Sequence, residues 1–196
     1  MYQRNAAKNF WRGPKNYYHN STPIKIIIYI NITIPYIMDA DELCRKLTEY
    51  SKYENVNVRR AVAGSNNLHN IPEECAYEIL SRLSEDDDEG VRWDVARNED
   101  IPEHCACEIL TRLSNDDAWG VRLVVAGNKS IPEDCACDIL TKLSRDKKNV
   151  YLRREVARNP NIPKDCACDI FTRLSEDDDE YVREGVARNP LYAKCR

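Results

Sequence analysis

The sequence predicts an all-α protein made of short two-helix repeats of about 30 residues, stacked into an α-solenoid. Three observations support this fold class. The chain repeats itself at a nearly fixed period, each period holds two short amphipathic patterns, and neither pattern can bury its apolar side alone. Stacking buries these apolar sides, because each unit then covers the apolar side of its neighbour.

The repeats cover residues 38–196. They divide into a half unit at 38–57, full units at 58–90, 91–120, 121–151 and 152–181, and a partial unit at 182–196. The last unit stops where the next long helix should begin, without the polar capping unit that a solenoid usually needs. We therefore expect either a truncated gene product or end-to-end self-association.

The unit at 91–120 illustrates the two helices. Its short helix is expected over V-R-x-x-V-A-x-N, with Val91 and Val95 one turn apart and Asn98 closing the helix in the left-handed conformation. The longer helix is expected to start at Pro102, because the fixed φ of proline suits the first helical turn. Its apolar stripe follows the spacing i, i+3, i+4, i+7, at Ala106, Ile109, Leu110 and Leu113.

Residues 1–37 stand apart from the repeats. Up to Met38 the chain holds five basic residues and no acid, whereas from Asp39 onward 24 Lys and Arg face 33 Asp and Glu. The apolar run at 24–34 follows a basic stretch, as in a leader peptide, but it is too short to form a stable membrane span. We expect Met38 to be the true start and 1–37 to be a disordered non-repeat extension. A cleaved or membrane-interacting leader is the alternative.

The stretches "VRWDVARNEDIP" (91–102) and "LRREVARNPNIP" (152–163) resemble the leucine-rich repeat variant family, relatives of the HEAT-like helical repeats. The resemblance covers the whole array. It implies a right-handed superhelix and, usually, a role in protein interaction. The units are longer than the usual family repeat by about one helical turn, so the second helix should be a full α-helix. Some family members carry a cysteine-rich iron–sulfur segment before the repeats, and no such segment precedes Met38.

A C-A-C triplet recurs in three units, and it is the most conspicuous chemical pattern. Positions i and i+2 of a helix point about 200° apart, so the two thiols of one triplet cannot bind one ion together. Equivalent cysteines of adjacent units should lie roughly 8–10 Å apart, too far for a shared zinc ion. We therefore predict that they are buried packing residues with reduced thiols, and we predict no cofactor. An iron–sulfur or metal-binding redox protein is the alternative, and its candidate ligands are Cys105, Cys107, Cys135, Cys137, Cys166 and Cys168.

An arginine and an aspartate also recur at fixed places. The arginines are Arg59, Arg92, Arg122, Arg153 and Arg183, and the aspartates six or seven residues before four of them are Asp86, Asp116, Asp146 and Asp177. The constant spacing predicts a structural ladder in which each acidic loop is tied to the helix that follows it. A cationic stripe for nucleic acid is the alternative, with Arg60, Arg97, Arg154, Arg158 and Arg188 as additional members. The net charge of −4 argues against a general phosphate-binding surface.

No catalytic pattern is recognisable in the sequence. The three histidines form no H-E-x-x-H pair, and the chain has neither a glycine-rich phosphate loop nor a G-x-S-x-G turn. We therefore predict a non-catalytic, cytoplasmic scaffold that binds another protein, with a nucleic-acid-binding HEAT-like protein as an alternative. Non-repeating residues on the short helices or the adjoining loops are the candidate contacts, namely Trp93, Arg97, Trp119, Arg154, Glu155 and Arg158.

Overall fold

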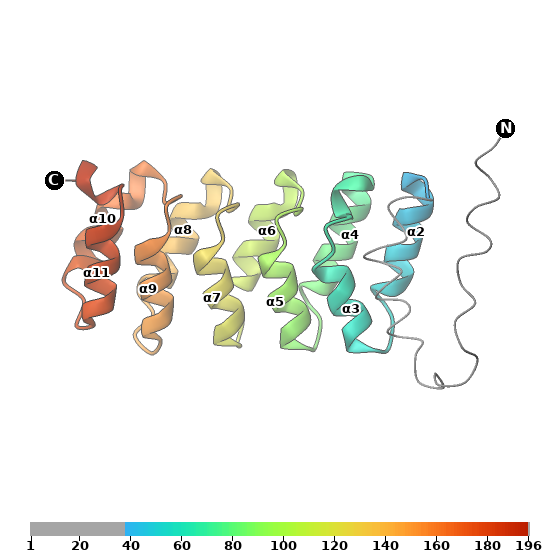
Figure 1. The fold of residues 1–196 in the computed structure, drawn as a ribbon, viewed down its shortest axis with the longest axis horizontal. Helices are drawn as coiled ribbons and strands as arrows, with labels where there is room; N and C mark the ends of the chain where they lie inside the picture. The colour runs from blue at the N-terminus through green and yellow to red at the C-terminus, as the bar shows by residue number, and fades with distance from the viewer. Residues whose placement is uncertain (1–37, 196) are drawn as a thin grey trace, which may run out of the picture.

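The structure is a computed structural model that describes residues 38–195, so the predictions made for residues 1–37 fall outside the described residues. Within this range the protein is all-α, with ten α-helices, two short 3₁₀ helices and no strand. Figure 1 shows the helices side by side along one axis, with the first described helix and the last at opposite ends.

Long and short helices alternate along the chain. The long helices are α2 (Ala40–Tyr50), α4 (Glu73–Leu83), α6 (Glu103–Leu113), α8 (Glu133–Leu143) and α10 (Lys164–Ser175). The short helices are α3 (Val56–Ala63), α5 (Glu89–Arg97), α7 (Trp119–Gly127), α9 (Val150–Arg158) and α11 (Glu180–Arg188), and the 3₁₀ helices are η3 (Leu68–Asn70) and η4 (Tyr192–Lys194). Consecutive long helices contact one another, as do consecutive short helices, so two rows pack against each other.

The core lies between the two rows. In α6 the apolar stripe is fully buried, and in α5 the side chains of Val91, Val95 and Ala96 are buried against it. Every unit places residues of the same kind at the same positions, which makes the core continuous from α2 to α11. Burying one such aliphatic side chain stabilises the fold by about 1.5–3 kcal/mol, so most of the stability comes from contacts between helices.

The long helices begin one residue later than expected. Pro102 has a ψ of 135°, which places it at the N-cap, and α6 starts at Glu103. The Pro102 carbonyl accepts the first helical hydrogen bond, from the Ala106 amide at 3.0 Å. Proline fits this position because the residue before a helix needs a carbonyl acceptor but no helical N–H.

The prediction of a left-handed asparagine at the end of each short helix is wrong. Asn98 has φ −68° and ψ 127°, and no residue other than glycine has a positive φ within 38–195. The side chain explains the extended backbone, since its Oδ1 accepts a hydrogen bond from the Asp100 amide at 2.7 Å. Asparagine side chains commonly bond to the backbone two residues on, and this turns the chain toward the next long helix.

The prediction that the chain has no stable membrane span can be tested only on the described part of the chain. None of the helices between residues 38 and 195 combines the length and the apolar character that a bilayer crossing requires.

Candidate functional site on the short-helix surface

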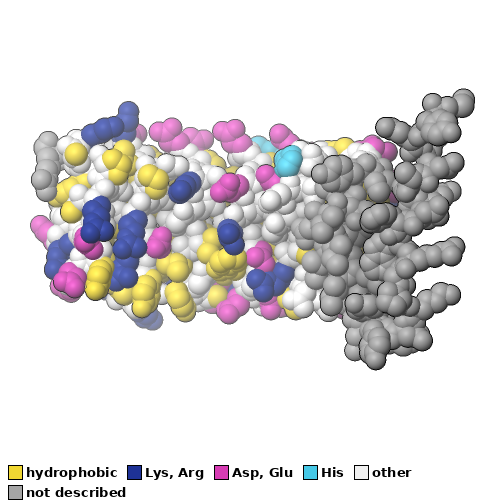
Figure 2. Space-filling view, in the orientation of Figure 1, with side chains coloured by type: hydrophobic (Ala, Val, Ile, Leu, Met, Phe, Trp, Pro, Cys, Tyr) yellow, Lys and Arg dark blue, Asp and Glu magenta, His cyan; other side chains and the backbone are white. Residues whose placement is uncertain are grey.

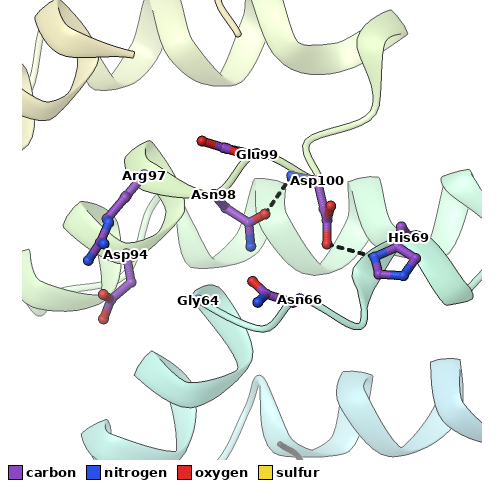
Figure 3. A pocket seen from close by; sticks show the side chains of 8 residues that line it. All are labelled: Gly64, Asn66, His69, Asp94, Arg97, Asn98, Glu99 and Asp100. Atoms are coloured by element: carbon purple, nitrogen blue, oxygen red, sulfur yellow. Dashed lines mark hydrogen bonds and ion pairs between the residues drawn. The ribbon is translucent and has the colours of Figure 1, made fainter. Parts of the chain in front are cut away.

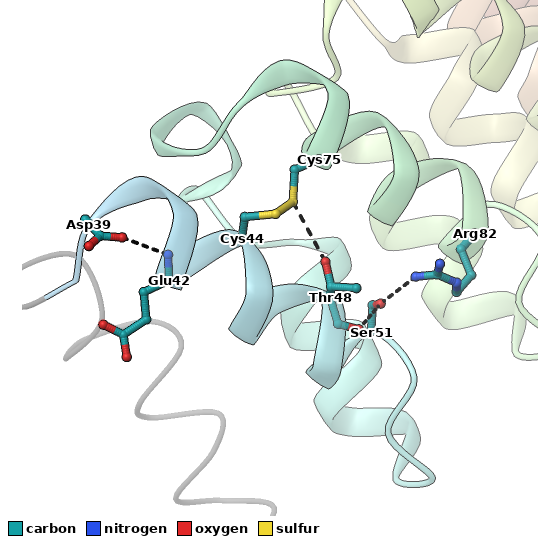
Figure 4. Close-up of a disulfide and its surroundings, with 7 residues drawn as sticks. All are labelled: Asp39, Glu42, Cys44, Thr48, Ser51, Cys75 and Arg82. Carbon is teal, nitrogen blue, oxygen red and sulfur yellow. Dashed lines mark hydrogen bonds between the residues drawn. A yellow bond between two sulfur atoms is a disulfide. The ribbon is translucent and has the colours of Figure 1, made fainter.

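Disulfides connect most of the neighbouring units. Within the described residues, four of the five unit interfaces carry one, and the first is shown in Figure 4. The bonds are Cys44–Cys75, Cys107–Cys135, Cys137–Cys166 and Cys168–Cys195. In each bond the second cysteine position of one unit meets the first position of the next, and the Cα atoms of the two middle pairs are 5.7 Å apart.

This geometry corrects the prediction that the cysteines only fill space, which is wrong for eight of the nine. The bonds join neither the two cysteines of one unit nor cysteines at equivalent positions of adjacent units. They are diagonal, from the second position of one unit to the first position of the next. The wide angle between positions i and i+2 directs the two thiols of one triplet toward two different neighbours. Cys135 therefore reaches back to α6 while Cys137 reaches forward to Cys166. Among residues 38–195, no three candidate ligands are grouped as a metal site requires.

Cys105 is the one free cysteine, because its diagonal partner position is occupied by Tyr77. Its thiol is buried and donates a hydrogen bond to the Pro102 carbonyl at 3.2 Å. Burial, followed by the nearby Glu108 carboxylate, raises the pKa of the Cys105 thiol to about 11. A thiol that stays protonated at neutral pH is a poor nucleophile and a poor metal ligand.

The asparagines that end the short helices also connect neighbouring units, and we call this series the asparagine ladder. Each buried amide donates from Nδ2 to a backbone carbonyl near the end of the preceding short helix. The bonds run from Asn98 to Ala63 at 2.6 Å, from Asn128 to Ala96 at 2.9 Å, from Asn159 to Ala126 at 2.9 Å and from Asn189 to Ala157 at 3.0 Å.

The repeated arginines and aspartates do form a ladder, but its register differs from the prediction. Arg92 donates from Nε and Nη2 to the carboxylate of Asp116, at 2.6 and 3.0 Å, and Asp116 belongs to the next unit. Its Nη1 binds the backbone carbonyl of Asp86, six residues before it, at 2.7 Å. Every arginine of the series except Arg183 thus joins its own loop to the following one. The other ion pairs are Arg59–Asp86 at 2.6 Å, Arg122–Asp146 at 3.5 Å and Arg153–Asp177 at 2.6 Å, and Arg183 binds the carbonyls of Asp177 and Asp178.

Three of the five additional arginines lie beside carboxylates, so they do not form an unpaired cationic stripe. Arg60 pairs with Asp94 at 2.7 Å, and Arg188 pairs with Glu184 at 2.5 Å. Arg154 lies 3.5 Å from Asp179, and its guanidinium stacks on tyrosine rings.

Three aromatic side chains are exposed on the short helices, and we call them the aromatic strip. They are Trp119 in α7, Tyr151 in α9 and Tyr181 in α11, with exposed fractions of 51, 54 and 49%. The rings of Trp119 and Tyr151 have centroids 6.2 Å apart. The Arg154 guanidinium lies 5.5 Å from the Tyr151 centroid and 4.6 Å from that of Tyr181, so it bridges the two rings. Figure 2 shows this region, where hydrophobic and basic side chains gather over α7, α9 and α11.

The predicted contact residues fall on the same surface, although not all lie together. Trp119 belongs to the strip, and Arg154 contacts its two tyrosines. Trp93 is half-buried, and the Arg97 guanidinium lies over its ring, 5.4 Å from the ring centroid. Glu155 is half-buried and Arg158 is exposed, both toward the end of α9.

Sequence reasoning missed Tyr151 and Tyr181, which belong to the aromatic strip. A signal for them existed, because the equivalent residues in the two preceding units are Gly90 and Gly120. A position that accepts both glycine and tyrosine does not belong to the core.

A groove opens between α5 and α7 beside the strip. It has a volume of about 190 Å³, and its walls are Glu89, Gly90, Trp93, Ala118, Trp119, Gly120 and Val121. Gly120 keeps the groove open, because a side chain at this position, where the later units have Tyr151 and Tyr181, would extend into it. At Gly90 a Cβ atom would instead meet the Arg60 side chain at 3.1 Å. A Cβ atom at Gly120 would have no heavy atom within 4 Å.

A larger, polar pocket of about 480 Å³ lies on the other side of α5 (Figure 3). His69 of η3 approaches it with Nδ1 3.1 Å from the Asp100 carboxylate, and the lining residues are Gly64, Asn66, His69, Asp94, Arg97, Asn98, Glu99 and Asp100. A histidine–carboxylate pair can activate a hydroxyl or a thiol, but these lining residues include neither. The pocket therefore lacks the nucleophile that a hydrolytic site of this type uses.

Comparisons with known proteins are sparse. No family model matches the chain, and no curated protein matches it either. Among solved structures, the crystal structure of an engineered protein aligns with 78% of this chain and 80% of its own, at 18% sequence identity and a TM-score of 0.48.

Proposed function

We propose that this chain is a non-catalytic α-solenoid scaffold that binds another protein through its short-helix surface. The proposal includes the right-handed superhelix and the leucine-rich repeat variant type expected from the sequence. Two packed rows of helices, bonded from unit to unit by disulfides and by two side-chain ladders, support a rigid array. A rigid surface loses little conformational entropy on binding, which suits a scaffold.

The aromatic strip is the observation that carries the proposal. Trp119, Tyr151 and Tyr181 are the exposed large hydrophobic side chains of residues 38–195. Tryptophan, tyrosine and arginine are the residues most enriched among those that dominate binding energy at protein interfaces. The contacts of Arg154 with both tyrosines hold the strip in one arrangement before any partner arrives.

The test compares a strip variant with a variant of the opposite face. We expect the full-length chain to capture a reproducible set of proteins from its native extract, and the double variant Trp119→Ala/Tyr151→Ala to lose them. The matched control, Thr111→Ala/Thr172→Ala, changes exposed residues on the long helices and should retain the set. Circular dichroism checks that both variants remain helical. Equal capture by the two variants would refute a binding role for the strip.

One observation favours a second candidate, a binder of single-stranded nucleic acid. Aromatic rings alternate with Arg154 in the strip, and bases stack on such platforms. Titration of the tryptophan fluorescence with a mixed-sequence oligonucleotide at low salt tests this reading. Saturable binding that weakens steeply with salt would favour nucleic acid over protein.

End-to-end self-association remains part of the proposal. The four disulfides on which the rigid array depends argue against the cytoplasmic location expected from the sequence. Disulfides persist mainly in oxidising compartments, so a cytoplasmic protein should be isolated with reduced thiols when cells are lysed directly into an alkylating reagent. Recovery of the four bonds from such cells would instead place the protein in an oxidising compartment. Sedimentation over a range of concentrations tests self-association.

A further inference from the structure

The groove between α5 and α7 has two aromatic walls held in fixed positions. The Trp119 ring packs against Tyr151 on one side, and the residue also lines the groove. Trp93 forms the opposite wall, and its ring already carries a guanidinium, that of Arg97. At about 190 Å³ the groove is smaller than the pockets that hold drug-sized molecules, but a single long side chain would fill it.

The charge around the groove is acidic. Glu89 lines it, is exposed, and makes neither a hydrogen bond nor an ion pair within the described part of the chain. Asp87 and Asp117 are exposed in the loops that lead into α5 and α7. Three nearby cations are neutralised, since Arg92 binds Asp116, Arg122 binds Asp146, and Arg60, which lies beside Gly90, binds Asp94. Arg97 is the exception, and it stacks on the Trp93 ring.

We propose that this groove binds a lysine or arginine side chain of a basic protein partner. The aliphatic stem lies between Trp93 and Trp119, where apolar contact stabilises it, and the cation meets the ring faces and the Glu89 carboxylate. Glycine at position 120 leaves room for that side chain, because no heavy atom lies within 4 Å of a Cβ placed there. The inference rests on the proposed protein-binding function and names the chemistry of the partner.

The test uses small probes on the full-length chain labelled with ¹⁵N. The indole N–H resonances of Trp93 and Trp119, assigned with Trp→Phe variants, should shift saturably with N-acetyl-lysine methylamide at millimolar concentration. The neutral isostere N-acetyl-norleucine methylamide should bind at least about five-fold more weakly, because it lacks the cation. Equal binding of the two probes, or tighter binding of the acidic probe N-acetyl-glutamate methylamide, would overturn the proposal.

Two variants and one control locate the site. Glu89→Gln should weaken the binding of the lysine probe by about five-fold and leave the binding of the norleucine probe unchanged. Glu180→Gln changes the equivalent first residue of α11 and should leave both unchanged. Gly120→Tyr gives α7 the tyrosine that α9 has at the equivalent position, where a Cβ atom has room. This variant should abolish the shifts and preserve the helical circular dichroism spectrum. Unaltered shifts in Gly120→Tyr would show that the probe binds elsewhere.

The same variants separate this inference from the proposed function. If Glu89→Gln and Gly120→Tyr retain every captured protein while the strip variant loses them, the groove proposal fails and the scaffold proposal stands. The double variant Tyr151→Ala/Tyr181→Ala leaves both tryptophan walls of the groove in place. If it retains its proteins while Glu89→Gln and Gly120→Tyr lose them, the groove stands and the strip does not.

Discussion

A single asparagine performs three tasks at the end of each of the short helices α5, α7, α9 and α11. The Asn128 side chain accepts from the Ser130 amide at 2.6 Å, which holds the turn, and donates to Ala96 of the preceding unit at 2.9 Å. Its own amide donates to the Val125 carbonyl at 3.1 Å and so ends the helix. Because Asn128 is buried, water cannot replace these partners.

We therefore expect Asn128→Ala to lower the free energy of unfolding by about 2 kcal/mol, since it leaves a buried carbonyl and a turn amide without their bonds. Urea denaturation monitored by circular dichroism measures the change. Asn66→Ala, at an exposed asparagine, is the matched control and should change stability by less than about 0.5 kcal/mol. Equal effects of the two substitutions would show that the ladder bond contributes nothing.

The Arg–Asp ladder predicts a dependence of stability on pH. The Arg153 side-chain hydrogen bond is the largest cause that holds the pKa of Asp177 below its ordinary value, and partial burial opposes it. A lowered pKa in the folded state means that this stabilisation is complete above the unfolded-state pKa of about 3.9 and is lost as the pH falls through the lower folded-state pKa.

Asp177→Asn should accordingly destabilise the protein at neutral pH by about 2 kcal/mol, and the difference from the parent should shrink below about pH 4. Urea denaturation at neutral and acidic pH measures both effects. Asp178→Asn, at the exposed neighbour, should show neither. A constant difference at every pH would mean that the carboxylate charge is not what stabilises the loop.

At the scale of the helices, the sequence pattern predicted where the helices lie, but it did not predict which side chains of neighbouring units contact one another. The spacing of Val91, Val95 and the α6 stripe predicted both helices of the unit correctly, because burial of one face depends on helical period alone. The cysteine pairs depend on how far one helix is displaced along its neighbour, and this offset is a property of the stack. The same offset decides that Asp86 binds Arg59 through its carboxylate rather than Arg92.

The candidate site was predicted only in part, because some of its residues stand out in the sequence while the groove depends on the packing of two helices. Trp119 and Arg154 could be selected because they do not repeat. The groove could not, since it forms only where Trp93 and Trp119 of different helices come to lie on either side of two glycines.

Each disulfide should stabilise the array by about 3.6 kcal/mol, the value for closing a loop of about 30 residues. We expect Cys137→Ala/Cys166→Ala to be destabilised by this amount without reductant and to approach the reduced parent when dithiothreitol is present. Alkylation of the unfolded, unreduced parent followed by intact-mass measurement should label one thiol of the nine. Labelling of all nine would show that the bonds do not form in the native protein.

Over the whole molecule, the disulfides divide the array into two covalently linked blocks. One block extends from α2 to α4 through Cys44–Cys75, and the other extends from α6 to η4 through the remaining three bonds. The interface between α4 and α6 has Tyr77 facing Cys105 in place of a bond. Because each repeat contacts only its neighbours, this interface should be where the oxidised array opens first.

Tyr77→Cys should close that gap by forming a bond with Cys105. The substitution removes the hydrogen bond from Tyr77 to Glu108 and the edge contact with His104, but it closes another loop of about 30 residues. We expect a net gain of about 2 kcal/mol under oxidising conditions and no free thiol after unfolding. Tyr77→Ser loses the same contacts without adding a thiol, so it should be slightly destabilised and keep one reactive cysteine. Two reactive thiols in Tyr77→Cys would mean that the two positions do not meet, and the diagonal register inferred for this interface would be wrong.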